Sequence, residues 1–267
     1  MPELPEVATI RSQLSEYLPF KILKTKTTPE LFQNVAHTKL NLKGLTLVEI
    51  RRKGKMLDFV FDDGSHLLSH LGMTGTWLVG EKLKAGKHSH LILESESMTL
   101  IYDDPRRFGH MYHYGPEDAD KKLAELGMDL ADPELTLEYI TASIKRYPDR
   151  ALKVTLLDQK LFAGSGNYIA NEICARAGIM PTRLCRDIKK SEFVKIHRAI
   201  SEVLNPAIES GGTTFQGGYR DSKGEKGLGV THLVVFYQKT CQLCGKNAVT
   251  KITLAGRGTY YCSRCQK

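Results

Sequence analysis

Residues 1–7 open the chain and read Met1-Pro2-Glu3-Leu4-Pro5-Glu6-Val7. If an aminopeptidase removes Met1, the ring nitrogen of Pro2 becomes a free secondary amine. An α-amino group has a pKa of about 7.7–8.0, so an appreciable fraction of this amine is an unprotonated nucleophile near neutral pH. Glu3 lies beside it and can donate or accept a proton. Proline also suits the first turn of an ordinary helix, so both interpretations of the stretch remain open at this point.

The residues behind this stretch predict an amphipathic helix over residues 5–18. Val7, Ile10, Leu14 and Leu18 recur at spacings of three and four, which places them on one helical face. Such a helix would hold the amine and the two glutamates in a rigid position, as a group meant for chemistry requires.

Between residues 20 and 114 the pattern changes to short β-rich runs. Asp62-Asp63-Gly64 separates two of them and is typical of a hairpin turn. Short strands at this spacing indicate an antiparallel sandwich or barrel. The expected strands are Ile22–Thr28, Leu45–Arg52, Met56–Phe61, His66–His70, His88–Leu93, Met98–Tyr102 and His110–Tyr114.

A helical pattern returns after residue 115 and indicates a second domain. Helices are expected over Ala151–Leu157, from about Asn167, and from about Ser191 to Leu204, where Pro206 would interrupt the last one. Residues 211–229 hold seven glycines, which predicts a mobile loop. The fold class is therefore α+β, with an N-terminal antiparallel β-sandwich behind a leading helix and a helical C-terminal part.

The charge balance favours a polyanionic partner. Lysine and arginine number 38 against 30 aspartates and glutamates, and the sequence pI is about 9.1. Such a balance favours nucleic acid ahead of a membrane surface. The chain has no run of 18 apolar residues, and its N-terminus carries acidic residues where a signal peptide carries basic ones. We expect a cytoplasmic protein.

Four cysteines near the C-terminus predict a metal site. Cys241 and Cys244 are separated by two residues, seventeen residues follow, and Cys262 and Cys265 repeat the spacing. Two such pairs match a site in which four thiolates hold one structural Zn²⁺. Two disulfides are disfavoured because no secretion signal is present, and a redox pair is disfavoured by the doubled spacing.

Two further segments are candidates for binding an anion. Arg257 is flanked by Gly256 and Gly258, which would let a backbone approach while the guanidinium reaches a phosphate. Residues 164–167, Gly-Ser-Gly-Asn, end at Asn167 and open a helix whose N-terminal amides favour a phosphate. Alternatively, Arg257 is a solvated hairpin arginine and residues 164–167 form an ordinary helix cap.

Two turns present residues that could act on a base stack. The segment 70–75 places Met73 between glycines, and the segment 104–109 presents Arg106 and Phe108. A long apolar side chain can wedge between bases, while an arginine and an aromatic ring can fill the space that an extruded base leaves. A core methionine and a hairpin arginine are the alternatives.

Together these residues resemble the formamidopyrimidine-DNA glycosylase family. The resemblance runs over nearly the whole chain, and the combination of motifs in this order is highly specific. The motifs are residues 2–7, Lys55, residues 70–75, 104–109 and 156–159, Gly164-x-Gly-Asn167, Gly212-Thr213-Thr214 and the four cysteines ending in Cys265-Gln266.

The resemblance implies a two-domain bifunctional DNA glycosylase and abasic-site lyase of base excision repair. Its expected organisation is a catalytic β-sandwich over residues 1–118, a linker over 119–133, a helix-two-turn-helix domain with a lesion loop over 134–230, and a zinc finger over 231–267. The implied partner is double-stranded DNA containing an oxidised base or an abasic site. We expect a monomer, associated with the nucleoid, that contacts no membrane.

The resemblance also assigns catalytic roles. It implies that Pro2 attacks the sugar C1′ of a flipped nucleotide and forms a Schiff base, with Glu3 as proton donor and shuttle. Lys55 matches the lysine assigned to β-elimination, and Arg257 the finger arginine assigned to δ-elimination and phosphate contact. A Schiff base formed by a secondary amine is permanently charged, so it acts as an electron sink without an added cofactor.

Other positions match residues that contact DNA in the family. Glu6 and Glu172 would support the site, or would be no more than a helix cap and a structural hydrogen-bonding group. The implied DNA-contacting residues are Met73, His88, Arg106, Phe108, Lys153 and Asn167.

Substrate preference is the least determined property. Leu4 favours the branch of the family that removes oxidised purines such as 8-oxoguanine and formamidopyrimidines. The branch that removes oxidised pyrimidines commonly has glycine at this position. A non-catalytic zinc DNA-binding protein would need neither Pro2 nor Glu3. The chain departs from the family pattern at Tyr168, where the aromatic is shifted by one position, at Asn171, which replaces an acidic residue, and in the loop 216–229.

Overall fold

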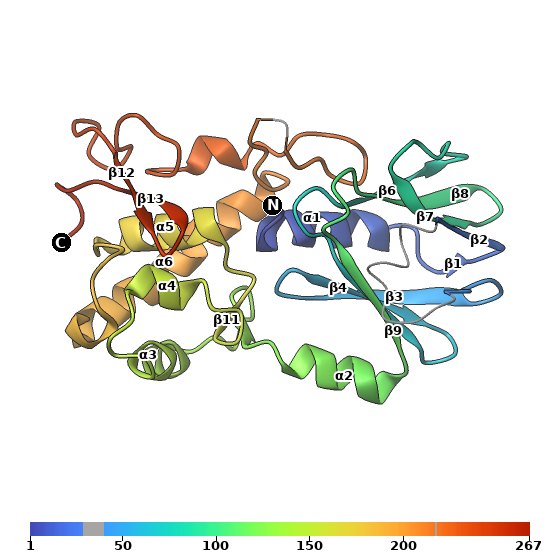
Figure 1. Cartoon of the computed structure of the whole chain (residues 1–267), viewed down its shortest axis with the longest axis horizontal. Coiled ribbons are helices and arrows are strands. Elements are labelled where there is room, and N and C mark those ends of the chain that lie inside the picture. Colours follow the sequence, from blue (N-terminus) through green and yellow to red (C-terminus); the bar gives the residue numbers. More distant parts are fainter. Residues whose placement is uncertain (29–39, 217) are drawn as a thin grey trace. The chain divides into compact units, whose positions relative to one another are not determined.

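The computed structural model describes residues 1–28, 40–216 and 218–267 (Figure 1). The chain divides into two compact units. The first comprises Met1–Glu125 together with Ser210–Leu228, and the second comprises Leu126–Glu209 together with Gly229–Lys267. Within the described ranges, no helix combines the length and the apolar composition needed to cross a membrane.

The first unit begins with helix α1, Leu4–Ser15. Val7, Ile10 and Leu14 are fully buried, as their spacing predicts. The helix ends before the predicted Leu18, because the proline at position 19 disfavours a helical conformation for the residue that precedes it.

Among the described residues of the first unit, nine strands form two antiparallel sheets. Their orders are β1-β3-β4-β5-β9 and β2-β7-β8-β6. The strands are β1 (Phe20–Lys21), β2 (Lys24–Thr27), β3 (Thr46–Lys53), β4 (Met56–Phe61), β5 (His66–His70), β6 (Thr76–Glu81), β7 (Ser89–Glu94), β8 (Met98–Asp103) and β9 (His110–Tyr114).

The two sheets and α1 share one apolar core. Phe59 of β4 and Trp77 of β6 come from different sheets, and their ring centroids lie 4.7 Å apart. The Trp77 indole donates to the hydroxyl of Ser69 on β5 at 3.0 Å, so its buried N–H is satisfied. The predicted antiparallel sandwich with a leading helix is confirmed.

Strand β6 was not predicted from the sequence. Trp77 and Val79 are buried and their neighbours are more exposed, which is the alternation of a half-buried strand. Gly75 and Gly80 bracket the run and lower its apparent strand propensity. The strand forms because its register with β8 pairs Trp77 with Tyr102 and buries both rings.

Helix α2, Pro116–Ala124, closes the first part of the chain. It overlaps the expected linker over 119–133 and contacts β5 and β9. Ala119 is its buried residue. This contact accounts for the assignment of the chain as far as Glu125 to the first compact unit.

The second unit is a set of helices with a C-terminal hairpin. Helix α5 ends at Gly178, whose φ of 72° is the left-handed conformation that glycine adopts readily. The elements are β10 (Met128–Asp129), α3 (Leu137–Lys145), α4 (Leu152–Leu156), β11 (Phe162–Ala163), α5 (Asn167–Ala177), α6 (Lys190–Glu209), β12 (Thr250–Leu254) and β13 (Arg257–Tyr261), with short 3₁₀ helices at Cys185–Asp187 and Gly229–His232.

Helix α6 corrects one prediction. It continues through Pro206 to Glu209 instead of stopping near Leu204. Pro206 lies in the last turn, where the missing N–H removes one hydrogen bond near a helix end. Ala207, the next residue, is buried, so the last turn stays packed despite the lost hydrogen bond.

The segment Ser210–Leu228 joins the first unit by its contacts, although the sequence placed it with the helix-two-turn-helix domain. Its partners are residues of α1 and β6, which lie up to about 200 positions away in the chain. No local pattern could reveal such contacts. The described part of the segment is therefore attached to the sandwich.

Candidate functional site

Pro2 and Glu3 precede the first turn of α1 and are buried. Glu3 and Glu6 form a capping box, in which the Glu3 N–H donates to Glu6 Oε2 at 2.6 Å. The second oxygen of the same carboxylate accepts the N–H of Thr213 at 2.6 Å. Glu6 therefore fixes the helix start and the Gly212-Thr213-Thr214 segment at once. Of the two roles considered for Glu6, these bonds support the helix-capping one.

Pro2 lines a cavity of about 170 Å³ in the first unit. Met1, which precedes it, is 49% exposed. The nitrogen of Pro2 is an amide in the full-length chain and stands in for the amine that remains once Met1 is removed. The other lining residues are Met73, Thr74, Gly75, Thr76, Asp103, Pro105, Gly218, Tyr219 and Arg220.

Lys55 lies in the turn between β3 and β4 and is buried. Burial lowers the pKa of His70 to about 4, and the positive charges of Lys55 and His110 add to this effect. His70 Nδ1 accepts the N–H of Gly72 at 3.1 Å. The sequence singled out Lys55 but gave His70 no role of its own. The imidazole holds the start of the segment that carries Met73, at a position where the charge of Lys55 affects its pKa.

The depressed pKa of His70 predicts loss of stability in acid. Because the folded-state pKa is about 4 and the unfolded value about 6.5, protonation favours the unfolded chain. The free energy of unfolding is therefore unaffected by protonation of His70 above pH 6.5. It falls by up to roughly 3 kcal/mol as the pH falls toward 4. His70→Asn keeps an acceptor for Gly72 and should shrink that loss. Urea unfolding at pH 7 and pH 4.5 measures it, and equal losses in both proteins would contradict the assignment.

The carboxylate of Asp104 holds two turns together. It is buried and accepts from the hydroxyl of Thr74 at 2.6 Å and from the N–H of Gly109 at 2.8 Å. A Cβ on Gly72 would lie 2.3 Å from the backbone of Phe108, so only glycine allows this approach. The turns that carry Met73 and Phe108 are thus fixed against each other.

These turns present three exposed or part-exposed side chains. Met73 and Phe108 are 42% and 46% exposed, so they are not core residues. The guanidinium of Arg106 lies over the Phe108 ring at 4.7 Å from its centroid. The two turns that carry the predicted wedge, Met73, and the predicted space-filling pair, Arg106 and Phe108, are therefore neighbours.

His88 lines a second cavity of the first unit, which is rich in basic side chains. This cavity of about 280 Å³ is lined by Lys87, His88, Arg107, His90, Thr28 and Pro105. The carbonyl of His88 accepts the N–H of Asp104 at 2.9 Å. The backbone of His88 is therefore held beside the turn that carries Arg106, and His88 shares the cavity with Pro105 and Arg107 of that turn.

In the second unit, Lys153 and Asn167 both bind the start of β13, next to the turn of the β12–β13 hairpin. Lys153 is fully buried and donates to the Gly258 carbonyl at 3.1 Å and to the Thr259 hydroxyl at 2.7 Å. Asn167 Nδ2 donates to the same carbonyl at 3.1 Å. Arg257 immediately precedes this anchored backbone and is exposed. The three residues meet at one place.

The departures at Tyr168 and Asn171 are accommodated by packing. Tyr168 is buried, with its ring 6.4 Å from that of Phe236. Asn171 donates to the Asn167 carbonyl at 2.6 Å and accepts the Tyr260 N–H at 2.7 Å. The accepted bond joins α5 to the hairpin, and the donated bond within α5 orients the amide. A carboxylate could make the first bond but not the second.

Glu172 holds a turn of the backbone. Its two oxygens accept the N–H groups of Val234, Val235 and Phe236 at 2.7, 2.9 and 2.8 Å. Burial raises the pKa of this carboxyl, while the three N–H groups act in the opposite direction. Of the two roles considered for Glu172, the structure supports the structural hydrogen-bonding one.

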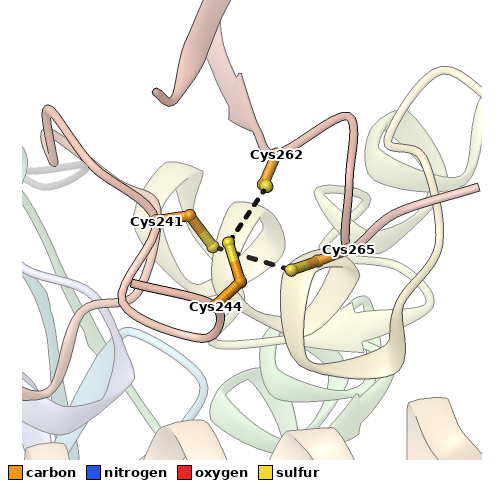
Figure 2. Close-up of side chains that lie close together, drawn as sticks. All are labelled: Cys241, Cys244, Cys262 and Cys265. Atoms are coloured by element: carbon orange, nitrogen blue, oxygen red, sulfur yellow. Dashed lines mark hydrogen bonds between the residues drawn. The ribbon is translucent and has the colours of Figure 1, made fainter. Parts of the chain in front are cut away.

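Cys241, Cys244, Cys262 and Cys265 form one structural zinc site. Their sulfur atoms all lie within 4.8 Å of one another (Figure 2). The pairs Cys241–Cys265 and Cys244–Cys262 are each separated by 3.9 Å. A tetrahedral ion with Zn–S bonds of about 2.3 Å separates its ligands by roughly 3.8 Å. The four thiols fit Zn²⁺ and form no disulfide.

The electrostatics of this cluster also favour a cation. The N–H groups of Asn247 and Lys246 lower the pKa of Cys244 to about 6. Burial and the neighbouring cysteines raise the pKa of Cys265 to about 12. Four thiolates at this spacing therefore need a positive ion between them. With four protein ligands the ion is structural and has no position for water.

Profile comparisons cover most of the chain. The formamidopyrimidine-DNA glycosylase N-terminal domain matches residues 1–111, the H2TH domain of that family matches 126–217, and the zinc finger found in FPG and IleRS matches 238–267. The three matches follow the order of the candidate motifs.

Full-length relatives agree with the profiles. A formamidopyrimidine-DNA glycosylase of Oceanobacillus iheyensis is 37% identical over 100% of this chain and 98% of its own length. The crystal structure of MutM (Fpg) from Thermus thermophilus has a TM-score of 0.88 at 34% identity, covering 99% of this chain and 98% of that one. A MutM bound to DNA containing carbocyclic 8-oxo-G has a TM-score of 0.89 at 29% identity over the whole of both chains. The chain belongs to the formamidopyrimidine-DNA glycosylase family.

Proposed function

We propose that this chain is a bifunctional DNA glycosylase and abasic-site lyase that removes oxidised purines from duplex DNA. The observation that carries the proposal is the position of Pro2 and Glu3, which precede a capped helix and border a cavity of about 170 Å³. Its relatives of matching length are formamidopyrimidine-DNA glycosylases. A cavity of this size suits one extruded base.

The amine of Pro2 is assigned the nucleophilic step. Its nitrogen forms a bond to C1′ as the glycosidic C–N bond breaks, and the base leaves with a proton. The nitrogen then loses its own proton, the C1′–O4′ bond breaks, and Glu3 protonates O4′, which leaves an iminium. The resulting iminium draws electrons from the sugar and acidifies the C2′ hydrogen. Loss of that proton breaks the C3′–O bond, and a second elimination breaks the C5′–O bond. We assign Lys55 to the first elimination and Arg257 to the second.

The remaining candidates are assigned to DNA binding. Asn167 binds the anchored start of β13 and Arg257 immediately precedes the bonded residue Gly258, so both suit a phosphate contact. Lys153 is buried against Gly258 and Thr259, so we propose that it positions the turn and does not touch DNA. Met73, Arg106 and Phe108 would fill the stack that the extruded base leaves, and His88 would contact the backbone beside them.

The formal net charge of +8 supports a polyanionic partner. We propose that the enzyme acts as a monomer on chromosomal DNA in the cytoplasm, since all candidate residues come from one chain. Duplex DNA with an oxidised base or an abasic site is the proposed substrate. Light scattering with and without a short duplex tests the monomer.

Substrate class is tested by excision from a panel of lesions. We expect 8-oxoguanine opposite cytosine and formamidopyrimidines to be removed at least about tenfold faster than oxidised pyrimidines. Single-turnover rates on duplexes that differ only in the lesion measure this. The opposite order would place the chain with the pyrimidine-specific branch, and absence of excision from every duplex would contradict an enzymatic function.

Replacing Arg257 tests the phosphate contact. Arg257→Ala should weaken binding to a duplex and reduce the slope of log Kd against log salt by about one, because one phosphate contact is lost. Fluorescence anisotropy at several salt concentrations measures the slope. Arg264→Ala removes the same charge from an exposed site of the same finger and should leave the slope unchanged. An unchanged slope for Arg257→Ala would contradict its role.

A further inference from the structure

Gln13 on α1 uses both polar atoms of its side chain to hold one distant turn. Its Nε2 donates to Asp221 Oδ2 at 2.7 Å, and its Oε1 accepts the N–H of Ser222 at 2.9 Å. Asp221 and Ser222 are both buried. A side-chain amide that donates and accepts at neighbouring residues fixes the turn in position and in orientation.

The turn is also closed by its own hydrogen bonds. Asp221 Oδ1 accepts the N–H groups of Lys223 at 3.0 Å and Glu225 at 2.8 Å. The Asp221 N–H in turn donates to the Glu225 carbonyl at 3.0 Å. One carboxylate oxygen therefore shapes the turn while the other binds Gln13. The two tasks are separate, so the attachment to α1 can be changed without dismantling the turn.

Strand β6 holds the other side of the same segment. The Val79 N–H donates to the Ser222 carbonyl at 3.0 Å, and the Thr76 hydroxyl donates to the Arg220 carbonyl at 3.1 Å. Strand β6 is at the edge of its sheet. The segment 218–225 is thus attached to α1 through Gln13 and to the sheet edge through Thr76 and Val79.

This attachment determines a wall of the Pro2 cavity. Gly218, Tyr219 and Arg220 line the cavity opposite residues of the N-terminal motifs. The Tyr219 carbonyl accepts the Thr214 hydroxyl at 2.9 Å, and its phenol donates to the Glu6 carbonyl at 3.3 Å. A shift of the turn at Asp221 would therefore move residues that face Pro2.

We propose that Gln13 is a positioning residue for base recognition. It holds the segment 218–225 in place before substrate arrives, so that Tyr219 and Arg220 form a preformed wall against the extruded base. This inference rests on the proposed function above. A preformed wall lowers the ordering cost of binding, and it acts only on a substrate that still has a base.

The two reactions of the site should depend differently on Gln13. Excision of 8-oxoguanine needs the base wall, whereas strand cleavage at an abasic site involves no base. Loss of the Gln13 attachment should therefore slow the first reaction and spare the second. A contact that only stabilised the fold would affect both reactions together.

Two single substitutions and their combination test the attachment. Gln13→Glu places a carboxylate against Asp221, and Asp221→Asn places two amide donors against each other. In the double variant the new asparagine Nδ2 can donate to the new glutamate, whose second oxygen still accepts from Ser222. The asparagine Oδ1 keeps the bonds to Lys223 and Glu225. The attachment is restored with its polarity reversed.

The measurements are single-turnover rates on an 8-oxoguanine duplex and on the same duplex with an abasic site, with thermal unfolding alongside. We expect each single variant to excise the base about tenfold more slowly and to cleave the abasic duplex at the wild-type rate. The double variant should return to within about twofold of wild-type excision. Ser12→Ala, on the exposed neighbouring position of α1, should match wild type.

Equal losses in both reactions, unchanged excision in the single variants, or failure of the double variant to recover would each overturn the role of Gln13. Those results leave the proposed enzyme intact as long as wild type cleaves the abasic duplex. A wild-type protein that acts on neither duplex would instead overturn the proposed function. The two failures are therefore distinguishable.

Discussion

A protein that retains Met1 should bind lesion-containing DNA but remove no base from it. The nitrogen of Pro2 is then an amide without a free electron pair, so it cannot form the Schiff base. The excision rate should fall by at least about a thousandfold, as for other enzymes that lose their nucleophile. Because Met1 is 49% exposed while Pro2 is buried, the extra residue is accommodated without disturbing the capping box of Glu3 and Glu6.

The comparison requires two preparations of one sequence. Protein made while methionine aminopeptidase is inhibited retains Met1, and untreated protein should begin at Pro2; intact mass distinguishes them. Single-turnover excision from an 8-oxoguanine duplex and anisotropy with a stable abasic analogue measure chemistry and binding separately. Equal excision by both preparations would contradict the role of the Pro2 amine.

Loss of one zinc ligand should have the second large effect. Cys262→Ala removes a buried sulfur from the cluster, and a site with three thiolates binds zinc far more weakly. The apparent binding energy of a structural zinc, about 10–16 kcal/mol, is comparable to the whole stability of a typical domain. The hairpin that carries Arg257 should therefore lose its structure, and DNA affinity should fall at least about a hundredfold.

Zinc content per chain and anisotropy with a short duplex measure these effects. Cys174→Ala is the matched control, because Cys174 is also buried but lies outside the cluster. We expect one zinc per chain in wild type and in this control, and none in Cys262→Ala. A Cys262→Ala protein that keeps its zinc or its DNA affinity would contradict the structural assignment.

Local patterns predicted most of the fold. The boundaries of β4, β5 and β9 match the predicted runs, and α1 has the predicted apolar face. The sequence did not predict strand β6, because the glycines in and beside it lower its local strand propensity. Its pairing with β8 is a tertiary contact that does not depend on that propensity. Helix α6 continues through Pro206 because tertiary burial outweighs one lost hydrogen bond.

The candidate site was predictable in its chemistry but not in its supports. Pro2 and the four cysteines stand in short motifs whose chemistry can be read without a structure, whereas the role expected of Lys55 came from the family resemblance. The residues that hold these motifs in place do so through contacts between distant parts of the chain. Gln13 binds Asp221, 208 positions away, and Lys153 binds Thr259, 106 positions away. Such partners follow from the folded backbone and leave no periodic signal.

The most direct test of the central assignment is the identity of the trapped residue. Borohydride reduction during reaction with an 8-oxoguanine duplex opposite cytosine should give a covalent protein–DNA adduct. Digestion and mass spectrometry should place that adduct on the N-terminal peptide, at the nitrogen of Pro2. An adduct on Lys55 or another lysine, or excision that proceeds with no trapped adduct, would contradict the account.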